Sequence, residues 1–409
     1  MLIRVILTIA SIALATISCS DSGADDYDDI IYSAINNYGL KPLPKKQFID
    51  TPFFRLGEAL FFDATLSGDK KLSCASCHFS DQVGADARSR VSRSQILEND
   101  QDVSDGAEVL LRNVPDLANR DHNSVVAMRW DGSLHIDPHT KQLRTPLDGW
   151  NPIGFDNLMA VQSVLPLFEE HEMLGRGNEL ERLVRDKSMA ERPDLIMAFL
   201  FRKIIKDEEY GGFLKGIRQE KLKSGASIIG NALAHYIEMF FNTSGGRFDR
   251  YIEGDREQLT KEEKEGAIIF LGKGRCIICH NGSLFSDFRY HSIGINDEEG
   301  QEDLGRYLVT KREEDKYKFK TPSLRNVAET APYFHNGMTS NLVDAIKLHI
   351  NPIRRADTYK KDGSFRYSTH EIDALSPILS YRFPLNDKEI KSLMSFLQTL
   401  SGPLAGQSY

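Results

Sequence analysis

The same five-residue pattern, Cys-x-x-Cys-His, occurs twice in this 409-residue chain, once in each half. It is the attachment signal of c-type haem, because two cysteines separated by two residues can both reach one porphyrin edge as thioethers. The histidine that follows can then turn its ring onto the iron as the proximal ligand. The two copies use four of the five cysteines. The sequence therefore predicts two covalently bound haems, on Cys74, Cys77 and His78 and on Cys276, Cys279 and His280.

Two other kinds of site contain paired cysteines, and both fit the sequence less well. A four-cysteine zinc site does not require a histidine after each pair, and its two pairs usually lie closer together in the chain. A thioredoxin-like redox site needs a βαβ setting, and no such pattern surrounds either motif. A di-haem protein is therefore the better interpretation.

The start of the chain has the composition of a targeting segment. In residues 1–18 one early cation, Arg4, precedes an apolar run over 5–15 that is too short to span a membrane, which predicts a signal peptide. Cys19 is then either part of the discarded signal or the lipidated first residue of a bacterial lipoprotein, and we favour the lipoprotein. Residues 19–42 would form a tether and leader, disordered over the acidic stretch 20–29. Both interpretations predict export to the periplasm.

Composition and charge limit the classes of partner. A hydrophobic content of 41% and a charged content of 27% are those of an ordinary globular protein, and the length predicts two or three domains. The net charge of −8 argues against nucleic acid and anionic lipid as partners. It would suit a basic small cytochrome.

The pattern of the remaining sequence is mostly helical, and strand alternation is scarce. Apolar residues recur at three-to-four spacing over 226–241, which predicts an amphipathic helix. Capping boxes that begin at Thr260 and Asn386 predict two more helices, the first running into the second haem motif. One haem motif in each half indicates an internal duplication. We therefore expect an N-terminal domain over 43–215 and a C-terminal domain over 216–409.

Five blocks of sequence, spread over roughly residues 51–402, resemble the bacterial di-haem cytochrome c peroxidase and MauG family. Two blocks, 56–78 and 248–280, lead into the two haem motifs. The block 112–132 contains Arg-Asn-Val-Pro and Trp-Asp-Gly, and the block 162–175 contains Glu-Met-Leu-Gly. The block 320–337 contains Lys-Thr-Pro-Ser-Leu-Arg-Asn and Pro-Tyr-Phe-His-Asn-Gly. The resemblance implies an all-α fold of two cytochrome c-like domains, each with one c-type haem, and a calcium ion at their interface.

The resemblance also assigns roles to three residues between the motifs. The haem on His78 would be the peroxidatic one, and Glu172 would be the distal acid that moves a proton between the peroxide oxygens. Gln162 would be the distal amide, and Trp130 would carry electrons between the haems. The alternatives are a solvated helix residue for Glu172, which lies in an acidic run, and a packed core residue for Trp130.

At one position the sequence departs from the family peroxidases in a way that changes the expected chemistry. Those proteins place a methionine on the distal side of the second haem, and the register here falls on His349. A second imidazole stabilises ferric iron more than a thioether does, so the potential of this haem should be lower. The alternatives are a surface histidine at 349 and Met338 as the ligand.

The surroundings of the first haem depart from the family as well. Ser94 stands where the best-known family peroxidases carry a removable histidine ligand, so the first haem would be open unless His122 closes it. An insertion between Trp130 and Gln162, which includes His135, His139 and Trp150, has no role that the sequence assigns. The resemblance further implies that calcium is bound by Asn113 and the backbone carbonyls of Thr330 and Pro332. An asparagine that only caps a turn is the alternative for Asn113.

These features lead to one leading hypothesis and two alternatives. The leading hypothesis is a cytochrome c peroxidase that reduces hydrogen peroxide to water with electrons from a small redox protein, a cytochrome c or a cupredoxin. It would be held at the membrane by lipid on Cys19, and a homodimer is one expectation for its assembly. The alternatives are a MauG-like oxidase of a protein or organic substrate, and a non-catalytic electron-transfer cytochrome.

Overall fold

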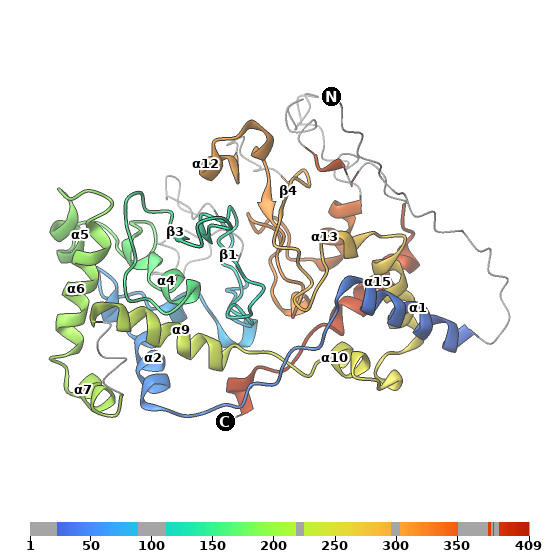
Figure 1. Ribbon diagram of the computed structural model, residues 1–409, viewed down its shortest axis with the longest axis horizontal. Coiled ribbons are helices and arrows are strands. Elements are labelled where there is room, and N and C mark those ends of the chain that lie inside the picture. The colour runs from blue at the N-terminus through green and yellow to red at the C-terminus, as the bar shows by residue number, and fades with distance from the viewer. Residues whose placement is uncertain are drawn as a thin grey trace.

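The computed structural model describes residues 23–88, 112–217, 225–295, 303–350, 375–377, 379 and 384–408. Figure 1 shows the helices in two groups side by side. The first group contains α2 (Pro52–Phe62), α4 (Leu158–Gln162), α5 (Glu179–Val184), α6 (Arg192–Ile204), α7 (Glu208–Lys215) and α9 (Ile228–Phe240). The second contains α1 (Gly23–Tyr38), α10 (Arg247–Ile252), α11 (Lys261–Leu271), α13 (Leu342–Ile350) and α15 (Asp387–Gln398), and the short α12 (Tyr307–Thr310) lies apart from both groups.

Short 3-10 turns and small strands connect these helices. The turns are η1 (Ala64–Leu66), η2 (Cys74–Ser76), η3 (Ser80–Gln82), η4 (Leu165–Phe168), η5 (Gly225–Ser227), η6 (Arg256–Gln258), η7 (Cys276–Ile278), η8 (Glu313–Asp315), η9 (Val327–Glu329) and η11 (Ala405–Ser408). The strands β1 (Ala127–Met128), β2 (Leu134–Ile136) and β3 (Leu143–Arg144) form an antiparallel sheet in which His135 lies opposite Ala127 and Arg144. In a second small sheet β4 (Tyr290–His291) pairs antiparallel with β5 (Phe319–Lys320). The described residues are thus helix-rich with few short strands, which confirms the predicted helical class in part; the haem in each domain stays a prediction.

The helices predicted from sequence patterns are confirmed. The amphipathic pattern over 226–241 corresponds to α9. At the start of α11 the Thr260 hydroxyl accepts from the Glu263 amide, and the Glu263 carboxylate accepts from the Thr260 amide. Asn386 and Glu389 make the same reciprocal pair at the start of α15. These capping boxes satisfy amide groups that the first turn of a helix leaves without partners.

Each group of helices is built around its own hydrophobic core. The first core runs from Phe54 to Phe241 and takes in Leu404 from the C-terminal end. The second contains residues of α1, α11 and α15, with Phe248, Phe270 and Phe396 among its largest buried side chains. Since α9 packs on α2 in the first core, that core extends past the boundary expected at residues 215 and 216.

The same helix crossing occurs in both cores. In each, the helix that precedes the haem motif carries a glycine at which a second helix crosses. A Cβ on Gly57 in α2 would lie 2.0 Å from the carbonyl oxygen of Ala232 in α9. A Cβ on Gly266 in α11 would lie 1.9 Å from the carbonyl oxygen of Ser392 in α15. The backbones therefore touch at both crossings, which is the structural counterpart of the internal duplication.

Gly266→Ala should destabilise the protein strongly, because the new methyl group overlaps the backbone of α15. Overpacking of this kind costs about 1–3 kcal/mol or more. The control is Gly211→Ala in α7, where a Cβ meets nothing within 4 Å and which should be neutral or stabilising by up to about 1 kcal/mol. Denaturant unfolding of the haem-loaded protein measures both, and equal midpoints for the two variants would contradict the crossing.

The chain begins differently from the sequence expectation. Residues 20–29 were expected to be a disordered tether, but α1 begins at Gly23 and packs on α11. Its Asp28 is buried and accepts a hydrogen bond from Tyr251 at 2.6 Å. It also pairs with Lys264 at 2.9 Å. The part of the expected tether from Gly23 onward is therefore anchored in the second core, while the expected signal peptide and Cys19 lie outside the described residues.

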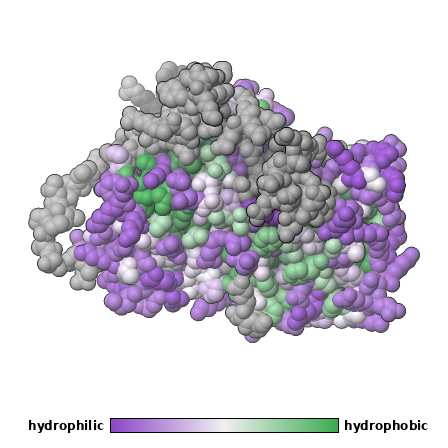
Figure 2. Space-filling view, turned by 180° about the vertical axis from the view of Figure 1, so that it is seen from behind, coloured by the Kyte–Doolittle hydropathy of each residue, from purple (hydrophilic) through white to green (hydrophobic). Residues whose placement is uncertain are grey.

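Among the residues that the structure describes, no helix has the length and apolar character needed to cross a membrane. Figure 2 shows the side opposite to that of Figure 1, where polar side chains cover most of the surface and apolar ones gather in smaller areas.

Candidate active site

The first haem motif is held in a tight local structure. Cys74 begins η2, and the His78 amide donates to the Cys74 carbonyl at 3.0 Å, which closes the motif into one turn. The loop that follows turns back, so that His78 Nδ1 donates to the Gly84 carbonyl at 2.5 Å. This bond fixes the ring and directs Nε2 to its other side, as in histidines that ligate metals.

The second motif repeats this arrangement. The His280 amide donates to the Cys276 carbonyl at 2.9 Å, and His280 Nδ1 donates to the Phe285 carbonyl at 2.9 Å. The four described cysteines form no disulfide, and burial raises the pKa of the Cys74 and Cys77 thiols to about 12. Both motifs thus present two thiols and one oriented imidazole, which is the donor set that covalent c-type haem requires.

Glu172 is brought close to the first haem motif. It follows η4 in a turn whose Met173 amide donates to the Pro166 carbonyl at 3.0 Å. The Met173 carbonyl in turn accepts from the Gly68 amide at 2.9 Å, in the loop that leads to Cys74. The charge of Glu172 raises the pKa of the Cys77 thiol. Burial, opposed by Arg129, raises the pKa of Glu172 itself. The side chain is therefore a partly buried carboxyl group beside the motif, with a raised pKa.

Gln162 ends α4 with a buried side-chain oxygen. Its Oε1 makes no hydrogen bond to any described residue. A buried polar atom without a partner is uncommon in a folded protein and often marks a place where a ligand or water binds. The Gln162 oxygen is therefore suited to binding a small polar ligand.

Trp130 lies where the two halves of the chain meet. Its indole Nε1 donates to the Asn113 carbonyl at 3.0 Å, and its own carbonyl accepts from the Lys320 amide on β5 at 2.8 Å. The next residue, Asp131, pairs with Arg112, and Arg112 makes two hydrogen bonds of 2.9 Å to Asp303. Burial by itself would raise the pKa of Asp131, but the Arg112 guanidinium, hydrogen bonds from Ser133 and the charge of Arg129 together hold it below its usual range. The tryptophan is thus fixed between segments of both halves.

His349 faces the proximal histidine of the second motif. The two rings have centroids 6.4 Å apart at an interplanar angle of 62°. His349 Nδ1 donates to the Ala345 carbonyl at 2.9 Å, and its ring stacks on Phe334. A metal–imidazole bond is about 2 Å long, and a ring centroid lies roughly 1 Å behind its nitrogen. Two imidazoles on opposite faces of one metal ion therefore have centroids about 6 Å apart. The observed separation fits an iron between His280 and His349.

The other histidines singled out in the sequence have different surroundings. Burial lowers the pKa of His122, and the charges that influence it are those of Asp121, Arg325 and Lys46. His135 lies on β2 and donates through Nδ1 to the Gly132 carbonyl at 2.9 Å. Ser94 lies outside the described residues. The structure therefore does not place His122 or His135 as a ligand of the first haem.

The insertion between Trp130 and Gln162 forms β2 and β3 and contains a buried tryptophan, Trp150. Trp150 is 6% exposed, donates through Nε1 to Asp194 at 3.0 Å, and packs edge-on against Phe155 and Phe168. Phe168 belongs to η4, immediately before the turn that carries Glu172. The insertion is thus packed against the support of Glu172, which its sequence did not indicate.

Asn113 and Pro332 meet at the contact between the halves. The Asn113 side chain donates through Nδ2 to the Pro332 carbonyl at 2.7 Å. Its backbone amide donates to the His335 carbonyl at 2.7 Å. The buried Oδ1 of Asn113 has no hydrogen-bond partner among the described residues. Thr330 belongs to the same segment as Pro332, directly after η9. A half-turn of the amide would put Oδ1 beside the carbonyl, so the oxygen donors suit a hard cation such as calcium.

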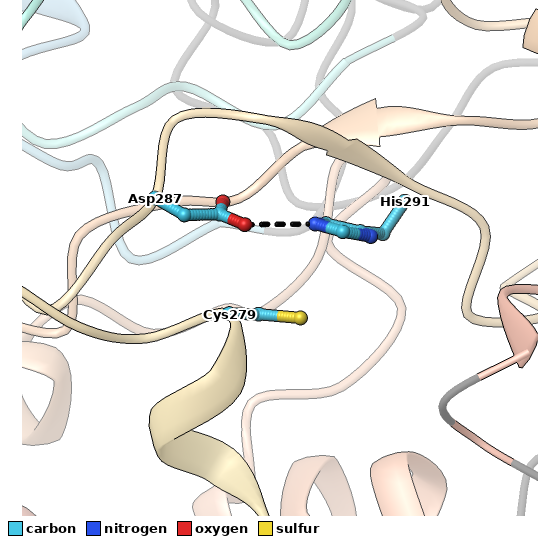
Figure 3. Close-up of side chains that lie close together, drawn as sticks. All are labelled: Cys279, Asp287 and His291. Carbon is cyan, nitrogen blue, oxygen red and sulfur yellow. Dashed lines mark hydrogen bonds and ion pairs between the residues drawn. The ribbon is translucent and has the colours of Figure 1, made fainter. Parts of the chain in front are cut away.

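One cluster near the second motif was not found from the sequence. Figure 3 shows Asp287 and His291 joined by a hydrogen bond, with the Cys279 sulfur beside them. The bond from His291 Nε2 to Asp287 is 3.0 Å long, and it raises the pKa of His291 to about 9. The three ligand atoms lie within 4.8 Å of one another. Because Cys279 belongs to the haem motif, the cluster marks the surroundings of that attachment and not a separate metal centre.

Comparison with known proteins places this geometry in context. Residues 52–257 match the family model described as di-haem cytochrome c peroxidase. The chain is 28% identical over 389 residues to the cytochrome-c peroxidase IdrP2 of Denitromonas iodatirespirans, covering 89% of this chain and 85% of that protein. It is 25% identical over 352 residues to the methylamine utilization protein MauG of Methylophilus methylotrophus, covering 85% and 82%.

A solved structure has a similar fold. The diheme peroxidase BthA from Burkholderia thailandensis superposes with a TM-score of 0.58 at 22% identity, over 89% of this chain and 94% of that one. At this identity the likeness concerns the fold, in which two helix-rich halves surround the site described above.

Proposed function

Because the chain belongs to the di-haem cytochrome c peroxidase family, we propose that it reduces hydrogen peroxide to water with electrons from a small redox protein. The observation that carries this proposal is the partly buried Glu172 carboxyl beside the first haem motif, with a raised pKa. A carboxyl group whose pKa is raised holds its proton more readily and can both take up and return one. The orphaned Gln162 oxygen supplies a second polar contact for a small ligand.

The two motifs would each hold one haem. Cys74, Cys77 and His78 would hold the peroxidatic haem, and Cys276, Cys279 and His280 would hold the electron-entry haem with His349 as its second ligand. When bound, haem supplies the iron redox chemistry that O–O cleavage needs. The pair of histidines would leave the second iron no open position, so we assign peroxide to the first.

The protein side chains would handle protons and position. Glu172 would accept the proton of the peroxide oxygen nearer the iron and return it to the departing oxygen, which leaves as water. Gln162 would hold the bound peroxide by a hydrogen bond. The reaction takes up two electrons and two further protons for each peroxide and releases two waters. Trp130, fixed at the contact between the halves, would offer an aromatic group between donor and acceptor.

A MauG-like oxidase is the second candidate, and the arrangement of His349 opposite His280 favours it. A bis-imidazole second haem would have a lower potential than one with methionine, so a high-potential donor would reduce it less readily. Oxidation of a protein or organic substrate would then deliver two electrons from that substrate to the haems through the same residues, and the peroxide would accept them.

Calcium, export and assembly complete the proposal. Calcium would bind Asn113 Oδ1 with the carbonyls of Thr330 and Pro332, since that oxygen is buried without a partner among the described residues. The signal peptide and lipidated Cys19 would place the protein in the periplasm, where c-type haem is attached. The donor would be a cytochrome c or a cupredoxin, and homodimer formation is part of the same proposal.

The first test is the haem content of the exported chain. A pyridine haemochrome assay on protein expressed with the haem-attachment machinery should give two haems per chain, both retained on a denaturing gel. Cys77→Ala should lower the number to one. A content of one in the unaltered protein would rule out the two-haem account.

A further inference from the structure

Lys320 is a buried cation that pairs with no carboxylate among the described residues. The structure buries three cationic side chains among the described residues, and two of them are paired with carboxylates. Lys264 pairs with Asp28 at 2.9 Å, and Arg325 pairs with Asp249 at 2.7 Å. Lys320 is 5% exposed, and its ammonium group lies over the Phe288 ring, 5.4 Å from the centroid.

The charges nearest to Lys320 do not neutralise it. They are Arg120 and Asp116, which are already paired with each other at 2.7 Å. Burial therefore lowers the pKa of Lys320 to about 7 in the chain alone. A buried ammonium group is costly unless an anion accompanies it, so the location calls for an anion that the described residues do not supply.

The location of Lys320 indicates which anion this is. Its amide donates to the Trp130 carbonyl, and β5 pairs with β4, which follows the second haem motif. The charges of Arg120 and Asp116, which influence the pKa of Lys320, also influence the pKa of His78 in the first motif. Lys320 thus lies between the two attachment sites, and every haem carries two propionate carboxylates.

We propose that Lys320 is the counter-ion of a haem propionate at the contact between the two halves, and that its charge raises the reduction potential of that haem. A nearby positive charge disfavours the ferric state, which carries one more positive charge than the ferrous state. The inference rests on the haem attachment in the proposed function but needs no peroxide chemistry, so the two can fail separately.

Lys320→Met in the haem-loaded protein tests this proposal, with both midpoint potentials measured by spectroelectrochemical titration. One haem should shift about tenfold toward the ferric state, which is about 59 mV for a one-electron couple. The haem that shifts is the one whose propionate Lys320 holds. Lys320→Arg should keep most of the original potential. The matched control is Lys318→Met, since Lys318 lies in the same segment, is partly exposed and pairs with Asp315 at 3.6 Å; it should leave both potentials unchanged.

Resonance Raman spectra provide an independent measurement. The propionate bending modes should shift in Lys320→Met and also in Lys320→Arg, because a guanidinium replaces the ammonium group. If Lys320→Met cannot be purified with both haems bound, the Lys320→Arg variant provides the test instead. Unchanged potentials in Lys320→Met would overturn the proposal, as would an equal shift in Lys318→Met or unchanged propionate modes in Lys320→Arg.

Discussion

Glu172→Gln should lower peroxide turnover by about 10²–10⁴-fold, the usual loss when a general acid–base group is removed. The amide keeps the size of the side chain but cannot carry a proton from one peroxide oxygen to the other. Both haem spectra should be unchanged, because Glu172 is not a haem ligand in this account. Steady-state oxidation of a reduced cytochrome c at saturating peroxide measures the effect.

The control for this variant is Glu170→Gln in the same acidic run. Glu170 pairs with Arg176 at 2.8 Å on the surface, so its loss should leave turnover within a factor of about two, in line with the small energies of surface ion pairs. The pH profile adds a second check. Burial raises the pKa of Glu172, so turnover should fall as the pH drops through that raised value, and this fall should be missing in Glu172→Gln. Wild-type turnover in Glu172→Gln would show that Glu172 is an ordinary turn residue without a catalytic role.

His349→Met should raise the potential of the second haem by on the order of 0.1–0.3 V, within the roughly 0.8 V range that axial ligands set. A thioether favours ferrous iron relative to an imidazole, and the first haem should change little. His349→Ala should remove the low-spin ferric signal of the second haem, because the ring that faces His280 at 6.4 Å is lost. Electron paramagnetic resonance of the ferric protein measures this directly.

Met338→Leu is the matched control, since Met338 is the other candidate ligand in the same region. It should leave both the potential and the low-spin signal as they are. A low-spin signal that survives in His349→Ala but disappears in Met338→Leu would transfer the ligand role to Met338.

The local features of this fold could be predicted because each depends on a few neighbouring residues. The capping boxes at Thr260 and Asn386 are such cases, because each is complete within four residues. The haem motifs fold into one turn each for the same reason. The family match supplied the longer-range part, since nothing near His349 in the sequence indicates that its ring faces His280.

Other features depend on contacts between distant segments, and the sequence did not reveal them. The helix α1 is stabilised by Lys264, Tyr251 and the second core, so its acidic sequence taken alone resembled a tether. In the sequence Lys320 is one residue of a family block. Its burial away from any carboxylate among the described residues is visible only in the structure, where β5 pairs with β4. Gly57 and Gly266 are ordinary helix residues by pattern, and only the crossing helices explain why a side chain is excluded there.

The most direct test of the account is a rapid-mixing experiment on the fully oxidised and on the donor-reduced protein. Before mixing, the ferric protein should show one high-spin and one low-spin haem. Peroxide should then oxidise two equivalents of a reduced small cytochrome for each peroxide consumed, with the first spectral change at the high-spin haem. Two low-spin haems whose spectra do not respond to peroxide, with no oxidation of the donor, would show that the chain is an electron carrier and would contradict the account.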